Sequence, residues 1–133
     1  MSTTGPWYYR TVRSLTAIYW SGIFILTHLP PAGLPPVRVS DRLAHFMVYL
    51  LLSVLLWASL WSGRRAVGRL GVTVIGTALL YGALDELTQP LVGRFASLDD
   101  WLADAGGVLV GVLVMSIVAG LMHVLRRDRT QQA

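Results

Sequence analysis

The sequence predicts an all-α membrane protein: a single domain over residues 1–133 that forms a four-transmembrane-helix bundle with two outward-facing loops. Three observations predict this fold. Hydrophobic residues make up 54% of the chain and charged residues only 14%, whereas about a quarter of an average soluble domain is charged. Four apolar stretches are each long enough to cross a membrane. The basic residues, all of them arginine, lie mostly at the ends of these stretches.

Each stretch has roughly the 20 residues that a helix needs to cross a ~30 Å hydrocarbon layer. We expect the four transmembrane helices at residues 11–28, 43–61, 70–88 and 101–125. The first stretch fits least well, because it is short and Arg13 interrupts it. A signal peptide is the alternative for this stretch, but THLPPAGLPP follows it without a clear cleavage site, and its prolines indicate an irregular loop.

The arginines predict the orientation of the bundle. Eight of the eleven lie before the first stretch or at its start, between the second and third, or after the fourth. The other three, Arg38, Arg42 and Arg94, lie on the opposite side. Because arginine is retained on the cytoplasmic side of membranes, we expect both termini in the cytoplasm and the loops 29–42 and 89–100 outside.

Five of the seven acidic residues fall within residues 85–104, beside the most apolar parts of the chain. Helical rise places Asp85, His45 and Asp104 about 24, 28 and 33 Å from the nearest cytoplasmic arginine of their helices, near the outer edge of the hydrocarbon. Ionisable groups at membrane depth are costly and usually face a partner or a wet cavity. The sequence therefore predicts a polar, outward-facing pocket.

Most residues of the predicted pocket lie in pairs at helical spacings that place them on shared faces, and the arginines of the outer loops are available as partners. They are Asp41, Arg42, His45, Tyr49, Tyr81, Asp85, Gln89, Arg94, Asp100 and Asp104. Below Asp104, the small residues of GVLVG (107–111) predict close packing of the fourth helix on the third.

Each pocket residue also has a purely structural interpretation. His45 with Asp41 is either an acid–base pair or a hydrogen bond at a helix start. Asp85 and Glu86 point about 100° apart on a helix, so we expect Asp85 to face inward with Gln89, and Glu86 to face a neighbouring helix or loop.

The outer loop carries similar alternatives. Arg94 either binds an anion or forms a salt bridge with Asp99 or Asp100. Ser97 precedes LDD (98–100) and is expected to cap the fourth helix rather than act as a nucleophile. His28 either joins the polar cluster or caps the first helix at the membrane interface.

Several functional classes receive no support from the sequence. There is no cysteine and no tight ligand motif such as H-E-x-x-H, so we expect no metal site and no cofactor, although Asp, Glu and His are chemically suitable ligands. The net charge of +4 reflects membrane orientation and does not indicate nucleic-acid binding.

Three motifs resemble those of the VanZ-like family, in the same order and spacing. DRLAHFMVY (41–49) resembles D-K-x-x-H-F-x-x-Y, DELTQ (85–89) resembles D-E-x-x-Q, and RFASLDDWLADAGG (94–107) resembles R-x-x-S-x-x-D-x-x-A-N-x-x-G. Two positions depart from the family pattern: Arg42 replaces a lysine, and Asp104 replaces an asparagine and adds an acid beside Asp100.

This resemblance implies which residues are functional and where in the cell the protein lies. The matching residues are Asp41, His45, Tyr49, Asp85, Glu86, Gln89, Arg94, Ser97, Asp100 and Gly107. The family is named for a protein associated with resistance to the glycopeptide teicoplanin. The resemblance therefore implies a multi-pass protein of the bacterial cytoplasmic (inner) membrane with a role in the cell envelope.

Three hypotheses from different classes follow. In the first, which we favour, the pocket binds an amphiphile such as a lipid-linked cell-wall intermediate or a lipoglycopeptide antibiotic. Arg94 and Arg42 hold its anionic groups, and its tail lies along the helices among membrane lipids. The second is a membrane hydrolase or transferase that uses His45 and Asp85. The third is a proton-coupled transporter, which is weaker because the charges gather at one edge of the membrane.

Overall fold

The computed structural model describes residues 5–29, 40–61 and 66–131, and these residues are helical apart from short connections. The elements are α1 (Pro6–Thr27), α2 (Asp41–Leu60), α3 (Val67–Thr88), the 3₁₀ helix η2 (Gln89–Val92) and α4 (Leu98–Gln131). The described residues contain no strand. The all-α prediction is confirmed, and each predicted stretch lies within a helix or overlaps one closely.

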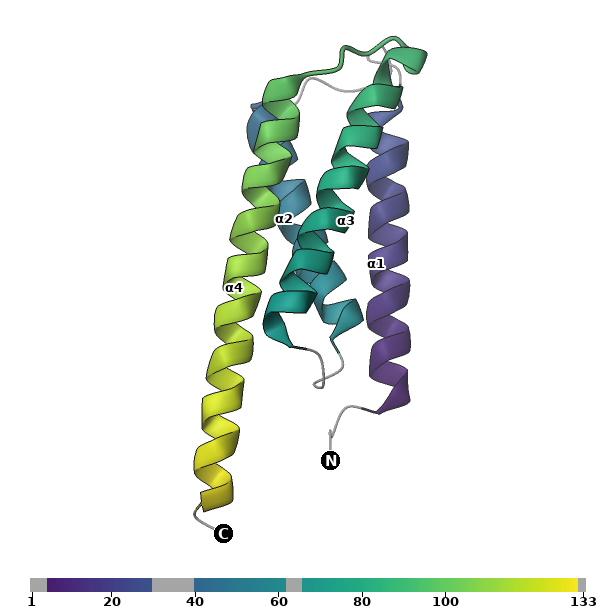
Figure 1. Cartoon of the computed structure of the whole chain (residues 1–133). Coiled ribbons are helices and arrows are strands. Elements are labelled where there is room, and N and C mark those ends of the chain that lie inside the picture. The colour runs from purple at the N-terminus through teal and green to yellow at the C-terminus, as the bar shows by residue number, and fades with distance from the viewer. Residues whose placement is uncertain (1–4, 30–39, 62–65, 132–133) are drawn as a thin grey trace.

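The four long helices run side by side as an elongated bundle (Figure 1). The first residues of α1 and the last residues of α4 lie at the same end, and α4 extends beyond the other helices there (Figure 1). The segment that joins α3 to α4 lies at the opposite end (Figure 1). The first residues of α1 and the last residues of α4 therefore lie together, at the end opposite the turn between α3 and α4.

Three helical segments of the described residues are long and apolar enough to cross a membrane. They are Asp41–Leu60, Val67–Val92 and Leu98–Leu125. Helix α1 has sufficient length but is less apolar, since Arg10 and Arg13 lie in its first half. The membrane crossing of α1 and the orientation of the bundle remain predictions.

Helix α1 nevertheless follows α2 over most of its length. The Arg13 Nε donates a hydrogen bond to the Ser59 carbonyl (3.4 Å), and the buried Thr16 hydroxyl donates to the Leu55 carbonyl (3.2 Å). Further along, the Tyr19 hydroxyl donates to the carbonyl of Val48 (3.0 Å). These bonds pair polar side chains of α1 with backbone carbonyl groups of α2.

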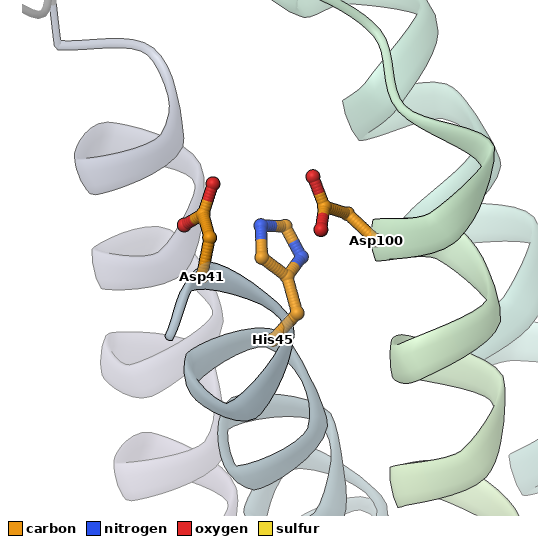
Figure 2. Close-up of side chains that lie close together, drawn as sticks. All are labelled: Asp41, His45 and Asp100. Atoms are coloured by element: carbon orange, nitrogen blue, oxygen red, sulfur yellow. The ribbon is translucent and has the colours of Figure 1, made fainter. Parts of the chain in front are cut away.

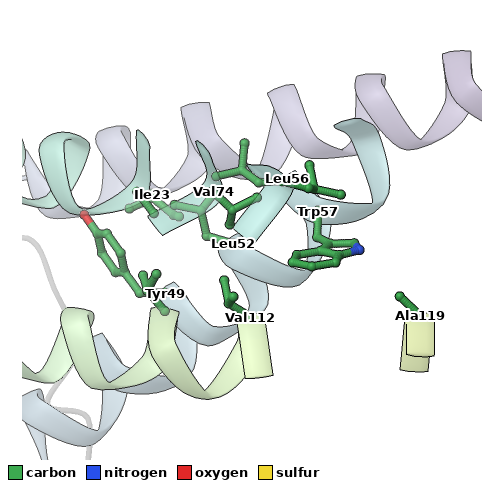
Figure 3. Close-up of a cluster of buried hydrophobic side chains, with 11 residues drawn as sticks. Ile23, Tyr49, Leu52, Leu56, Trp57, Val74, Val112 and Ala119 are labelled. Atoms are coloured by element: carbon green, nitrogen blue, oxygen red, sulfur yellow. The ribbon is translucent and has the colours of Figure 1, made fainter. Parts of the chain in front are cut away.

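The hydrophobic core lies between the helices and is centred on α2. Figure 3 shows Tyr49, Leu52 and Trp57 of α2 together with Val74 of α3 and Val112 of α4, all of which are buried. The opposite faces of the helices expose large apolar side chains, as expected of surfaces that meet lipid tails.

The closest helix approach is between α2 and α4. A Cβ atom added to Gly107 would overlap the Phe46 carbonyl oxygen, and one added to Gly111 would overlap the Ser53 hydroxyl. The prediction that GVLVG packs the fourth helix on the third was therefore wrong, because these glycines lie against α2. Only a residue without a side chain permits this backbone contact, and the contact sets which residues of α2 and α4 meet above it.

The turn between α3 and α4 follows local chemistry. Pro90 lies in η2, where the α-helical hydrogen-bond pattern has already ended. Gly93 has φ 79°, in the left-handed region that favours glycine. The Ser97 Oγ accepts a hydrogen bond from the Asp100 backbone N–H (3.3 Å), which confirms its predicted capping role. This turn carries Arg94 over the ends of α2 and α4.

Candidate functional site

A cavity of about 310 Å³ lies at the end of the bundle away from the chain ends. The first turns of α2 and α4, together with η2 and the turn that follows it, line this open cavity. Its lining residues are Asp41, His45, Gln89, Gly93, Arg94, Phe95, Ser97 and Asp100. Five of the ten residues predicted for the pocket therefore line one cavity.

His45 is the centre of the site and is held from below by Asp104. The His45 Nδ1 lies 2.9 Å from Asp104 Oδ1, and the two side chains are 10% and 2% exposed. An ionised Asp104 accepts this bond from Nδ1–H, and the second ring nitrogen, Nε2, then carries a lone pair. Among the described residues Nε2 has no hydrogen-bond partner.

Two carboxyl groups flank the imidazole at the cavity. Figure 2 shows the His45 ring between Asp41, at the start of α2, and Asp100, in the first turn of α4. One ligand atom from each of the three residues lies within 4.8 Å of the other two. The predicted grouping of Asp41, His45 and Asp100 is thus present in space.

Glu86 lies deeper and is buried, with 6% exposure. Its Oε2 accepts a hydrogen bond from the Ser97 backbone N–H (2.8 Å), and its Oε1 accepts one from Gln89 Nε2 (3.3 Å). It also lies close to the His45–Asp104 pair. We expected Glu86 to face a neighbouring helix or loop. The bond to Ser97 confirms this, and Glu86 ties the loop down above α3.

Asp85 is buried and turns toward α1 rather than toward the cavity. Its Oδ1 accepts a hydrogen bond from the Thr27 hydroxyl (2.8 Å), and its Oδ2 accepts one from Gln89 Nε2 (3.3 Å). The His28 Nδ1 lies 3.7 Å from Asp85 Oδ1, and the His28 Nε2 lies 2.9 Å from the Thr88 hydroxyl oxygen. Asp85 is therefore buried and bonded to Gln89, but it faces α1 and does not line the cavity. The prediction that it faces the pocket was wrong, and its contact with Thr27 was not predicted.

Tyr49 and Tyr81 lie below the cavity with their rings stacked, 6.1 Å between centroids. Both hydroxyl groups are buried and have no hydrogen-bond partner among the described residues. Gly82 lies beside them: a Cβ there would be 3.4 Å from the Tyr49 hydroxyl oxygen and 3.3 Å from Asp104 Oδ2. The tyrosines thus border the carboxyl group that supports His45 without lining the cavity.

The two arginines predicted for the pocket lie in different surroundings, and the third outer arginine, Arg38, lies outside the described residues. Arg42 forms an ion pair with Asp99 at the surface, where their side chains are 67% and 57% exposed, and it does not line the cavity. Arg94 lines the cavity and forms no ion pair within the described part of the chain. Its backbone N–H donates to the Gln89 carbonyl (3.2 Å), which fixes the turn. Of the two, Arg94 is therefore the guanidinium available to a ligand.

Comparisons with known proteins give one result. A family model described as VanZ/LLP1 matches residues 8–119, which include every residue of the cavity and of the buried cluster beneath it. Searches of the curated proteins and of the solved structures give no match.

Proposed function

We propose a function from the premise that this chain belongs to the VanZ/LLP1 family. The protein lies in the bacterial cytoplasmic membrane with both termini in the cytoplasm. Its outer cavity binds the anionic head group of an amphiphile, either a lipid-linked cell-wall intermediate or a lipoglycopeptide. The tail of the ligand lies along the apolar faces of the helices.

The observation that carries this proposal is the composition of the cavity wall. Arg94 supplies a guanidinium that has no ion-pair partner among the described residues, and the next residue, Phe95, is 93% exposed beside it. A guanidinium suits phosphate and carboxylate, which it binds through two hydrogen bonds. An exposed phenyl group suits an acyl or prenyl chain. A volume of about 310 Å³ accommodates a compact head group.

The proposed orientation draws support from charge and from packing. The arginine distribution favours cytoplasmic termini. The ends of α1 and α4 lie together at one end of the bundle, opposite the cavity (Figure 1). The hydrogen bonds of α1 to the carbonyl groups of α2 run from Arg13 to Tyr19, which favours α1 as a fourth crossing despite its lower hydropathy.

Binding of a defined head group tests the proposal. We would measure the affinity of the purified protein in nanodiscs for a fluorescent polyprenyl diphosphate and for teicoplanin. We expect Arg94→Ala to weaken the affinity for at least one of them by about 10- to 100-fold, the range of a charge-assisted hydrogen bond. Arg42→Ala is the matched control and should bind like the wild type. Equal affinities for wild type and Arg94→Ala would overturn the assignment.

A second function, hydrolysis or group transfer on the same class of substrate, is favoured by the 2.9 Å contact between His45 and Asp104. A carboxyl group that orients one ring nitrogen leaves the other as a general base toward the cavity. We expected Asp85 to act with His45 in this function, but Asp104 is the carboxyl group within hydrogen-bond distance of the imidazole. If this function is correct, turnover of a lipid-linked substrate disappears in His45→Ala. Retained turnover in that variant would exclude the role.

A further inference from the structure

We propose that Asp41, His45 and Asp100 form a binding site for a divalent transition-metal ion such as Mn²⁺ or Zn²⁺. The first reason is that only acceptors converge there. One atom from each side chain lies within 4.8 Å of the other two. Neither carboxyl group receives a side-chain hydrogen bond or forms a salt bridge with an arginine within the described residues. Two carboxylate groups at this separation repel each other, and a bound cation would remove this repulsion.

The second reason is the orientation of His45, which is independent of the acidic residues at the cavity. Its side chain is nine-tenths buried, and its Nδ1 is held at 2.9 Å by the buried Asp104. A histidine that ligates a metal commonly donates its other ring N–H to a carboxylate, which fixes the ring and makes the ligating nitrogen more basic. Asp104 is thus a positioning residue that directs Nε2, which has no hydrogen-bond partner among the described residues, toward the cavity.

A different set of ligands, His45, Glu86 and Asp104, lies deeper in the bundle at similar separations. Their atoms are already engaged. Glu86 accepts hydrogen bonds from the Ser97 backbone N–H and from Gln89, and Asp104 is bonded to His45 Nδ1. A cation at this position would have to displace these bonds, whereas the outer set has no such bonds to lose. The outer set is therefore the favoured site.

The ligand chemistry sets the class of cation. One imidazole nitrogen with two carboxylates suits Mn²⁺ or Zn²⁺, whereas Mg²⁺ and Ca²⁺ prefer all-oxygen sites. Ligand distances of 2.0–2.2 Å require the three atoms to approach each other by a small side-chain rotation, and the exposed Asp41 is free to make one. The remaining coordination positions would face the cavity, on the side of Arg94. This inference replaces our sequence-based expectation of no metal site.

A purely structural interpretation of the same acids exists. Asp41 and Asp100 lie in the first turns of α2 and α4, where a negative charge stabilises the helix dipole. That role requires no metal and predicts that their removal changes stability alone. The metal site predicts a loss of metal binding, and the two interpretations are distinguished by a direct titration.

The experiment is calorimetric titration of the purified, chelator-treated full-length protein in detergent with Mn²⁺ and with Zn²⁺. We expect one saturable site per chain, and at least tenfold weaker binding in Asp41→Asn and in Asp100→Asn. Asp99→Asn is the matched control, since it removes a neighbouring exposed carboxylate outside the site, and it should retain wild-type affinity. Helical content by circular dichroism identifies any variant that fails to fold.

Two further measurements complete the test. Pulsed electron paramagnetic resonance of bound Mn²⁺ should show a ¹⁴N coupling in the wild type that disappears in His45→Ala. Glu86→Gln should bind the metal like the wild type. No saturable binding to the wild type, or unchanged affinity in Asp41→Asn, would overturn the site. Loss of affinity in Glu86→Gln alone would place the metal in the deeper set and also overturn it. A metal on Nε2 excludes a proton-accepting role for that nitrogen.

Discussion

The contact between α2 and α4 gives the sharpest prediction about stability, since it decides whether Asp104 lies beneath His45. We consider the substitution Gly107→Ala. A Cβ at residue 107 would overlap the Phe46 carbonyl oxygen, and it would lie 2.9 Å from the Leu50 backbone nitrogen and 3.0 Å from the Phe46 carbonyl carbon. All three are backbone atoms, so no side-chain rotation relieves the contact and the helices must separate.

The magnitude follows from two opposing effects. Replacement of a helix-interior glycine by alanine on its own stabilises a helix by about 0.5–1 kcal/mol. Overpacking costs about 1–3 kcal/mol, and separation of the helices also weakens the His45–Asp104 hydrogen bond, which contributes about 1.5–3 kcal/mol as a charge-assisted bond. We therefore expect Gly107→Ala to reduce the free energy of unfolding by about 2–4 kcal/mol.

The assay is thermal or denaturant unfolding of the purified protein in detergent, monitored by circular dichroism. Gly120→Ala is the matched control on the same helix, because a Cβ there meets nothing within 4 Å. It should be neutral or stabilising. If Gly107→Ala is as stable as Gly120→Ala, then α2 and α4 do not approach as described, and the position of Asp104 beneath His45 is refuted.

Three further substitutions test separate parts of the polar cluster by the same unfolding assay. Thr27→Val removes the hydroxyl that donates to the buried Asp85 (2.8 Å) and should cost about 1–3 kcal/mol; an unchanged stability would show that α1 does not cap this carboxyl group. Tyr49→Phe removes a buried hydroxyl that has no partner among the described residues and should be neutral or stabilising; a loss above about 1 kcal/mol would reveal a bonded hydroxyl. Arg42→Ala breaks an exposed ion pair and should change stability by less than about 1 kcal/mol; a larger loss would show that Arg42 has a structural role beyond the surface.

Helix positions were predictable because lipid imposes a simple constraint. A run of apolar residues must be helical to satisfy its backbone groups, so hydropathy located α2, α3 and α4 to within a few residues at most ends. The Ser97 cap and the pairing of Asp85 with Gln89 were also predictable, since both follow from helical geometry within one segment. The C-terminal end of α4 was not predictable from hydropathy. Its last residues are polar and yet remain helical.

Contacts between helices were less predictable, since helical periodicity shows which faces are polar or small but not which helix lies opposite. GVLVG was assigned to the wrong neighbour for this reason. Sequence reasoning also assigned anionic groups of the ligand to both Arg94 and Arg42, and only the folded turn separates a surface ion pair from a cavity residue. The contact of Thr27 with Asp85 was not predictable from the sequence. Residues with hydroxyl groups are common within membrane helices and usually bond to the backbone of their own helix.

The central claim, an outward-facing cavity that binds an amphiphile, is tested most directly by thiol labelling, since the chain has no cysteine of its own. Phe95→Cys places a thiol at the cavity, and Ala66→Cys places an exposed one at the other end of the bundle. In right-side-out membrane vesicles, a membrane-impermeant maleimide should label residue 95 and not residue 66, and a saturating amount of the amphiphile identified by the binding assay should slow the labelling of residue 95. Labelling of residue 66 alone would show that the cavity faces the cytoplasm, and labelling of residue 95 at an unchanged rate in the presence of that ligand would contradict binding at this site.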